Sequence, residues 1–137
     1  MPSLLLTNAN RICNKLDDLS VLVQAHNPTL IAVTESWLDD SIPDSAISLR
    51  SFSVLRRDRQ GQQGGGVLLY VNNSIMSRRL TDLVDNDCSS EFEILWALLR
   101  PHFLPRSTSV LIISIVYCPP WYSAIMNSNL CHYILYY

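Results

Sequence analysis

The stretch SLLLTNANRICNKLDDLSVLVQAHNPTLIAVTE, residues 3–35, predicts a strand, a helix and a second strand. Residues 3–7 and 30–34 are short apolar runs that suit buried strands. Between them, residues 15–25 carry leucine and valine at helical spacing, with one apolar face. Asn14 is a candidate N-cap, and Asn27 followed by Pro28 ends the helix. The short links indicate one βαβ unit with parallel strands and a right-handed crossover.

Two polar residues follow these strands directly. Asn8 comes after the first strand, and Glu35 comes after the second. Because parallel strands end at the same edge of a sheet, an amide and a carboxylate would face one crevice, where open α/β sheets tend to bind ligands. A purely structural explanation fits as well: Asn8 as a turn residue and Glu35 as the cap of a following helix. The pattern alone leaves both open.

The rest of the chain is rich in strand patterns. Apolar runs at residues 52–55, 66–71, 92–99 and 110–117 are separated by loop-like segments with proline, asparagine and glycine. One early helix followed by strands predicts an α/β (α+β) fold with a mixed sheet, or two packed sheets with helices outside. The most apolar run, 110–117, is far shorter than the roughly 20 residues that span a bilayer, so we expect no membrane segment.

Composition excludes some classes of function. The chain has 137 residues, of which 48% are hydrophobic and 16% charged, as in one globular domain. Its formal net charge of −2 argues against a protein that only coats nucleic acid. An enzyme that contacts a few phosphates is compatible with this charge, since nine of the ten basic residues are arginine. The planar guanidinium of arginine can form two parallel hydrogen bonds with phosphate, which the lysine ammonium cannot.

The glycine block RRDRQGQQGGGVLLYV, residues 56–71, contains all four glycines of the chain. It lacks the lysine and the following helix of a phosphate-binding P-loop, and a strand follows where a dinucleotide fingerprint needs a helix. The block therefore predicts a flexible connection between two strands of a hairpin, in which glycine supplies positive φ.

No metal or nucleophile motif is evident among cysteines and histidines. The cysteines (Cys13, Cys88, Cys118 and Cys131) lack zinc spacing, and the histidines (His26, His102 and His132) are scattered. No signal peptide opens the chain, so we expect reduced thiols in an intracellular protein.

Four blocks resemble the endonuclease domain of LINE-type (non-LTR) retrotransposons. They are NANRICNKLDDL (residues 8–19), TESWL (34–38), the glycine block (56–71) and IISIVYCPP (112–120), in the order of that family. Any one block is weak, whereas the four together are specific and span most of residues 3–120. The family belongs to the endonuclease/exonuclease/phosphatase superfamily, with pancreatic deoxyribonuclease and apurinic endonuclease as relatives.

The resemblance implies a four-layer α/β sandwich of the deoxyribonuclease-I-like type and metal-dependent hydrolysis of DNA phosphodiesters. Asn8, Glu35 and Tyr117 match active-site residues, with Glu35 and Asn8 holding Mg²⁺. Arg57 and Arg59 are candidate contacts to the DNA backbone, and the resemblance implies a nuclear location if the ancestral function is retained. No protein partner can be inferred.

Two later motifs of the family, a Gly-Asp-Phe-Asn-like block and a Ser-Asp-His-like block, do not occur here. We interpret residues 1–120 as a partial endonuclease domain, truncated at its C-terminus, and 121–137 as an unrelated tail. Cys118 also departs from the arginine usual between the tyrosine and the two prolines. These departures predict an inactive phosphodiesterase domain whose inner sheet face lacks its partner layer. A non-enzymatic remnant that binds nucleic acid weakly, or a superfamily phosphatase or phospholipid phosphodiesterase, are the alternatives.

Overall fold

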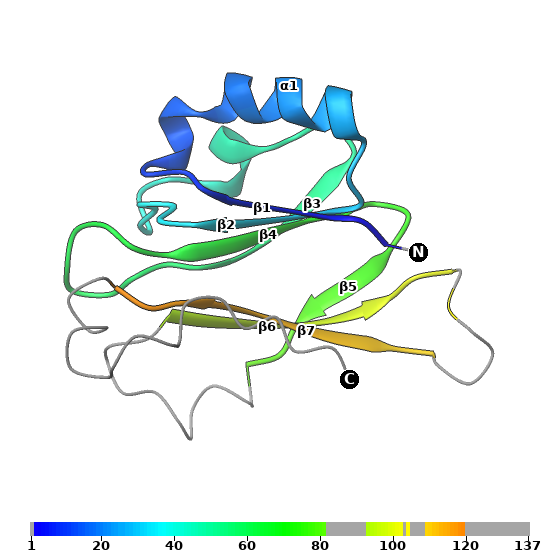
Figure 1. Cartoon of the computed structure of the whole chain (residues 1–137). Coiled ribbons are helices and arrows are strands. Elements are labelled where there is room, and N and C mark those ends of the chain that lie inside the picture. Colours follow the sequence, from blue (N-terminus) through cyan, green and yellow to red (C-terminus); the bar gives the residue numbers. More distant parts are fainter. Residues whose placement is uncertain (1, 82–92, 103, 105–108, 120–137) are drawn as a thin grey trace.

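The computed structural model describes residues 2–81, 93–102, 104 and 109–119. Its elements in chain order are β1 (Leu4–Asn8), the 3₁₀ turn η1 (Ile12–Asn14), α1 (Leu16–His26), β2 (Leu30–Thr34), the 3₁₀ turn η2 (Asp44–Ile47), β3 (Phe52–Arg57), β4 (Val67–Asn72), β5 (Met76–Arg79), β6 (Glu93–Arg100) and β7 (Leu111–Tyr117). They form a helix layer and two sheets, stacked one above the other (Figure 1). Of the four layers predicted, the described residues form these three.

The first sheet has the strand order β1-β2-β4-β3 and begins with the predicted βαβ unit. β1 and β2 are parallel, with Asn8 opposite Thr34, while β4 is antiparallel to both β2 and β3. The 3₁₀ turn η1 precedes α1, so the prediction that Asn14 caps the helix is wrong: Lys15 occupies the N-cap without a side-chain hydrogen bond. Asn27 ends the helix in the left-handed conformation (φ 45°), as an asparagine after the last turn commonly does.

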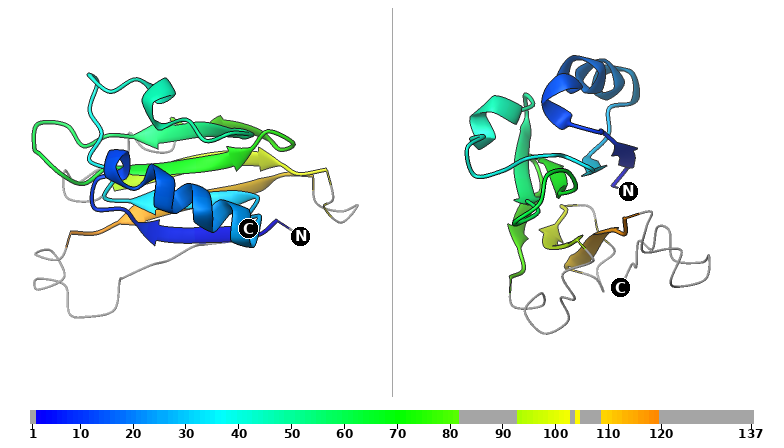
Figure 2. Two further views of the ribbon diagram at one scale, coloured as in Figure 1. Left: turned by 90° about the horizontal axis from the view of Figure 1, so that it is seen from above. Right: turned by 90° about the vertical axis from the view of Figure 1, so that its left-hand side faces the viewer.

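The second sheet, β5-β6-β7, is antiparallel throughout and packs against the first (Figure 2). Apolar side chains of both sheets meet between them, among them Ala32, Leu69, Leu95, Ala97 and Ile115. The prediction of an uncovered inner face is therefore wrong for the first sheet, because the chain itself supplies β5, β6 and β7. Strand β4 is buried on both faces, which explains why its sequence is a continuous apolar run rather than an alternating one.

The opposite face of the first sheet is covered by α1 and the two 3₁₀ turns. Tyr70 of β4 is fully buried in this second core, where its hydroxyl donates to the Ile47 carbonyl (2.7 Å) and its ring meets the edge of Phe52. Within the described residues no helix has the length and apolar character needed to cross a bilayer.

Strand β5 is an element that the sequence did not reveal. Its residues, MSRR, alternate between exposed and half-buried positions and pair with the far half of β6. The predictions for Cys88, Phe92, Cys131, His132 and the 121–137 tail lie outside the described residues.

Candidate functional site

The carboxyl ends of β1 and β2 lie side by side at one edge of the first sheet. The Ala9 N–H donates to the Thr34 carbonyl (3.0 Å), and the Arg11 N–H donates to the Glu35 carbonyl (3.0 Å). These bonds continue the pairing of the two strands beyond their ends. Asn8 is exposed there, its side-chain oxygen accepts the Asn10 N–H (3.1 Å), and Glu35 is half-buried. The two residues predicted from strand ends thus share one edge.

Tyr117 reaches the same edge from the second sheet. It is the last residue of β7, and its hydroxyl donates a hydrogen bond to Glu35 Oε1. Burial and this bond to Glu35 raise the pKa of Tyr117, so that the phenol stays protonated and remains a donor at neutral pH. The contact orients one oxygen of the Glu35 carboxylate and ties together the two sheets.

The backbone around these residues is strained. Four of the six described residues other than glycine that have positive φ lie here: Asn10 (43°), Arg11 (83°), Glu35 (51°) and Trp37 (57°). Side chains disfavour this region, and residues held in it cluster at functional sites because surrounding bonds must impose the conformation. Two backbone hydrogen bonds hold the segment after Glu35 in this conformation: the N–H groups of Ser36 and Trp37 donate to the carbonyls of Gly66 (3.1 Å) and Gly65 (2.8 Å).

Glu93 belongs to the site and was not predicted. It is 6% exposed, lies opposite Tyr117 in the β6–β7 pairing, and accepts hydrogen bonds from Arg59 and from the Gly66 N–H. A signal was available in the sequence, since Glu93 begins the inward-facing series of β6 that continues with Leu95. A carboxylate at a position that the strand pattern buries needs charged or N–H partners.

The three arginines before the glycines play different roles. Arg56 binds the Asp44 and Asp58 carboxylates and two loop carbonyls, which fastens the loop after β2. Arg57 donates to the Ile94 carbonyl (2.8 Å), a bond that joins the two sheets. Arg59 alone extends to the site, where its guanidinium pairs with Glu93 and lies 6.0 Å from the centre of the Tyr117 ring.

The glycine block forms the connection between β3 and β4, as predicted, and all four glycines have positive φ. Two of them also lie where no side chain fits: a methyl group on Gly65 would overlap Glu93 and Arg59, and one on Gly66 would overlap the Ser36 hydroxyl. The block therefore shapes the edge of the site through its backbone.

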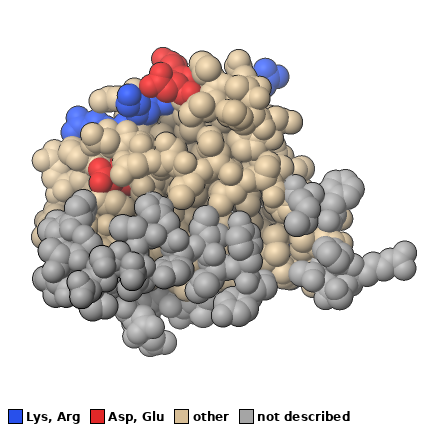
Figure 3. Space-filling view, viewed as in Figure 1, with Lys and Arg blue, Asp and Glu red and all other residues tan. Residues whose placement is uncertain are grey.

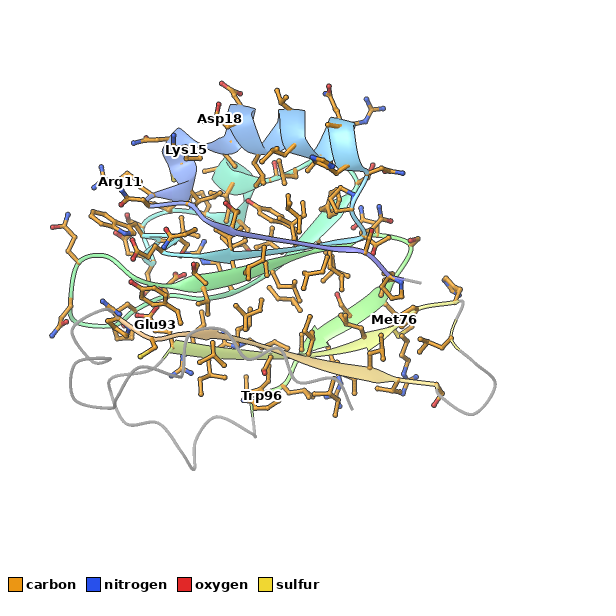
Figure 4. All side chains as sticks on the ribbon, viewed as in Figure 1. Arg11, Lys15, Asp18, Met76, Glu93 and Trp96 are labelled. Carbon is orange, nitrogen blue, oxygen red and sulfur yellow. The ribbon has the colours of Figure 1, made fainter. Side chains whose placement is uncertain are left out.

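A cavity of about 360 Å³ is lined by residues that flank Glu35, although Glu35 itself is not part of its wall. Its wall includes Arg11, Trp37 and Arg59, together with Gln62 and Gln63 of the glycine-block loop. Arg11 and Glu93 lie at the same end of the stacked layers, and Met76 lies at the other (Figure 4). Basic and acidic side chains are both visible at the Arg11 end of the surface (Figure 3).

The donors at this edge suit a hard cation that keeps most of its water. Among the described residues no three His, Cys, Asp or Glu side chains gather as a metal cluster. Glu35 and Asn8 offer a carboxylate and an amide oxygen, and Mg²⁺ is commonly held by one or two carboxylates plus water and phosphate. Glu93 is not available, because Arg59 and Gly66 engage its two oxygens.

Comparison with known proteins supports the fold. No protein-family model and no curated protein matches the chain. Among solved structures it is similar to the AP endonuclease LMAP from Leishmania major, with a TM-score of 0.62 and 15% sequence identity. The match covers 85% of this chain and 40% of that protein. The fold is thus the α/β sandwich of the deoxyribonuclease-I-like type, and the chain spans less than half the length of that protein.

Proposed function

We propose that the chain is a nuclease-like phosphodiesterase domain, derived from a non-LTR retrotransposon endonuclease, whose substrate is DNA. The observation that carries the proposal is the hydrogen bond from Tyr117 to Glu35, which joins the ends of two sheets at the edge where Asn8 also lies. The resemblance of the four sequence blocks supports the retrotransposon branch over a phosphatase or phospholipid phosphodiesterase.

Each residue has a proposed role. Glu35 and Asn8 would hold Mg²⁺, which when bound stabilises negative charge on phosphate oxygens. Tyr117 donates to one oxygen of Glu35, so the second oxygen is left for the cation. Arg59, held by Glu93, would face the DNA backbone. A backbone contact by Arg57 stays a prediction, and its bond to the Ile94 carbonyl makes it the weaker candidate.

The water-activating base is the part we do not find in the described residues. His26 ends α1 and His102 follows β6, so both lie at the sheet edge away from Glu35. Loss of a general base costs roughly 10²- to 10⁴-fold in rate, and loss of further members of the same unit adds to the deficit. We therefore expect the 137-residue chain not to cleave DNA at a useful rate. Because Glu35 is the single carboxylate proposed for the metal, we also expect residues 1–120 to bind metal loosely.

The test has two parts. Nicking of supercoiled plasmid with Mg²⁺ should be no faster for the chain than for Glu35→Ala, with Asp40→Ala as a control for loss of an exposed carboxylate. In NMR spectra, Mn²⁺ should broaden the backbone signals of Asn8 and Glu35 in the parent and not in Glu35→Gln. Absence of this broadening in the parent would refute the proposed metal site. Nicking that disappears in Glu35→Ala would refute the predicted inactivity while supporting the phosphodiesterase class.

The second candidate function is a non-enzymatic fragment that binds nucleic acid. The lack of a histidine beside Glu35 in residues 2–81, 93–102, 104 and 109–119 favours it, and metal-independent DNA binding that survives Glu35→Gln would support it. The coding DNA downstream offers a further test, since Gly-Asp-Phe-Asn and Ser-Asp-His motifs there would identify a retroelement frame.

A further inference from the structure

We infer that the cavity lined by Arg11, Trp37 and Arg59 is a nucleotide subsite, which binds one nucleotide of a DNA strand next to the phosphodiester at Glu35. The inference deepens the proposed function and rests on it for the identity of the strand. The residues that carry it are Arg11, Trp37, Arg59, Gln62 and Gln63, none of which is needed for the metal site.

The first argument is that the guanidinium groups of two arginines at the cavity have hydrogen-bonding groups without a partner among the described residues. Arg11 forms no ion pair with any described residue, and its guanidinium lies 5.1 Å from the centre of the Trp37 ring. Arg59 is bound to Glu93 through Nε, which leaves its two terminal nitrogens without a hydrogen-bond partner in the described part of the chain. The Asp39 carboxylate also lines the cavity, and its Oδ1 accepts hydrogen bonds from the N–H and the hydroxyl of Ser41, so the two arginines outnumber one partly satisfied carboxylate. Two guanidinium groups on one cavity favour an anionic ligand, and phosphate matches their planar fork.

The second argument is the mixture of apolar and polar side chains in the rest of the cavity wall. Trp37, Leu38 and Ile42 provide apolar surface, while the amides of Gln62 and Gln63 have no partner among described residues. The Trp37 indole N–H is buried and makes no hydrogen bond there either, and buried donors of this kind normally find an acceptor. Ligand cavities combine apolar walls with a few polar groups and hold roughly 300–1,000 Å³. Side-chain amides can pair with the edge of a base.

The third argument is position. Arg11 donates its backbone N–H to the Glu35 carbonyl, and Trp37 lies two residues after Glu35. Arg59 contacts both the cavity and the Tyr117 ring. A ligand in the cavity is therefore a near neighbour of a phosphate at Glu35, which fits one step along a strand.

The probe is a fluorescein-labelled DNA trinucleotide of mixed sequence with phosphorothioate links, measured by fluorescence anisotropy in EDTA and again in Mg²⁺. Arg11→Gln should weaken binding in EDTA about ten-fold, which corresponds to about 1.4 kcal/mol. Arg50→Gln removes the same charge from an exposed site that lines a different cavity, and should have little effect. Gln62→Ala should weaken binding, whereas Gln60→Ala, outside this cavity, should not.

A readout without substitution uses Cys13, an exposed free thiol in the cavity wall. The trinucleotide should slow alkylation of Cys13 but not of Cys118, as mapped by mass spectrometry, whereas inorganic phosphate at the same concentration should protect far less. Equal losses in Arg11→Gln and Arg50→Gln, or no protection of Cys13, would overturn the subsite. Failure of the metal site alone is distinguishable: the binding gained with Mg²⁺ would then be absent, while the binding in EDTA would still depend on Arg11.

Discussion

Glu93→Gln should destabilise the protein strongly, although the substitution replaces only one carboxylate oxygen by an NH₂ group. Glu93 is 6% exposed, and its two oxygens accept the Arg59 Nε–H and the Gly66 N–H. Glutamine keeps one acceptor and turns the other into a donor, so that one of these N–H groups loses its bond. The Arg59 side chain, only 18% exposed, would also hold a positive charge without its counterion.

Breaking a buried ion pair from one side costs about 3–5 kcal/mol. We expect about 3 kcal/mol, the lower end, because Arg59 can turn part of its guanidinium toward the cavity and solvent. The double variant Glu93→Gln with Arg59→Met should recover most of the loss, since no unpaired charge is left and the Gly66 N–H still finds an acceptor.

Urea unfolding followed by tryptophan fluorescence measures these changes. With a slope of about 1–3 kcal/mol per molar urea, a loss of 3 kcal/mol lowers the midpoint by roughly 1–3 M. Asp18→Asn is the control: the Lys15–Asp18 pair has side chains 53% and 73% exposed, and exposed pairs contribute at most about 1 kcal/mol. A cost for Glu93→Gln as small as that of Asp18→Asn, or a double variant as unstable as the sum of its parts, would refute the reasoning.

Three further changes test other parts of the structure. Gly66→Ala should cost about 2 kcal/mol in urea unfolding, because φ is +83° and the new methyl group would overlap the Ser36 hydroxyl; a neutral result would contradict the geometry of the turn. Tyr70→Phe should cost about 1–3 kcal/mol by leaving the buried Ile47 carbonyl without its donor, and an unchanged midpoint would show that another donor replaces it. Burial raises the pKa of Tyr70, and burial with the bond to Glu35 raises that of Tyr117, so their contribution to stability is complete below about pH 10 and is lost as pH rises toward the folded-state pKa. An absorbance titration should show tyrosines that ionise only on unfolding, and full ionisation of the folded protein near pH 10 would exclude this.

Local pattern in the sequence was enough for the βαβ unit and the glycine turn. Strand and helix periods are properties of neighbouring residues, and the parallel pairing of β1 with β2 follows from the short crossover between them. The edge position of Asn8 and Glu35 follows in turn, because parallel strands end together. The Gly65 and Gly66 turn was predictable for the same reason, since positive φ is a local demand.

Strand pattern did not place Tyr117 at that edge; the resemblance of the sequence blocks implied it, and only the tertiary structure decided which side-chain contacts form there. Tyr117 and Glu35 are 82 residues apart and come from different sheets, so their contact depends on how the apolar faces of those sheets stack. The same stacking buries Glu93 beside Arg59 and turns Arg57 toward the Ile94 carbonyl. Strand β5 has almost no pattern of its own and exists because β6 offers it a free edge. Burial between sheets is a long-range property: the chain encodes which faces are apolar, and the packing of those faces determines which polar groups become partners.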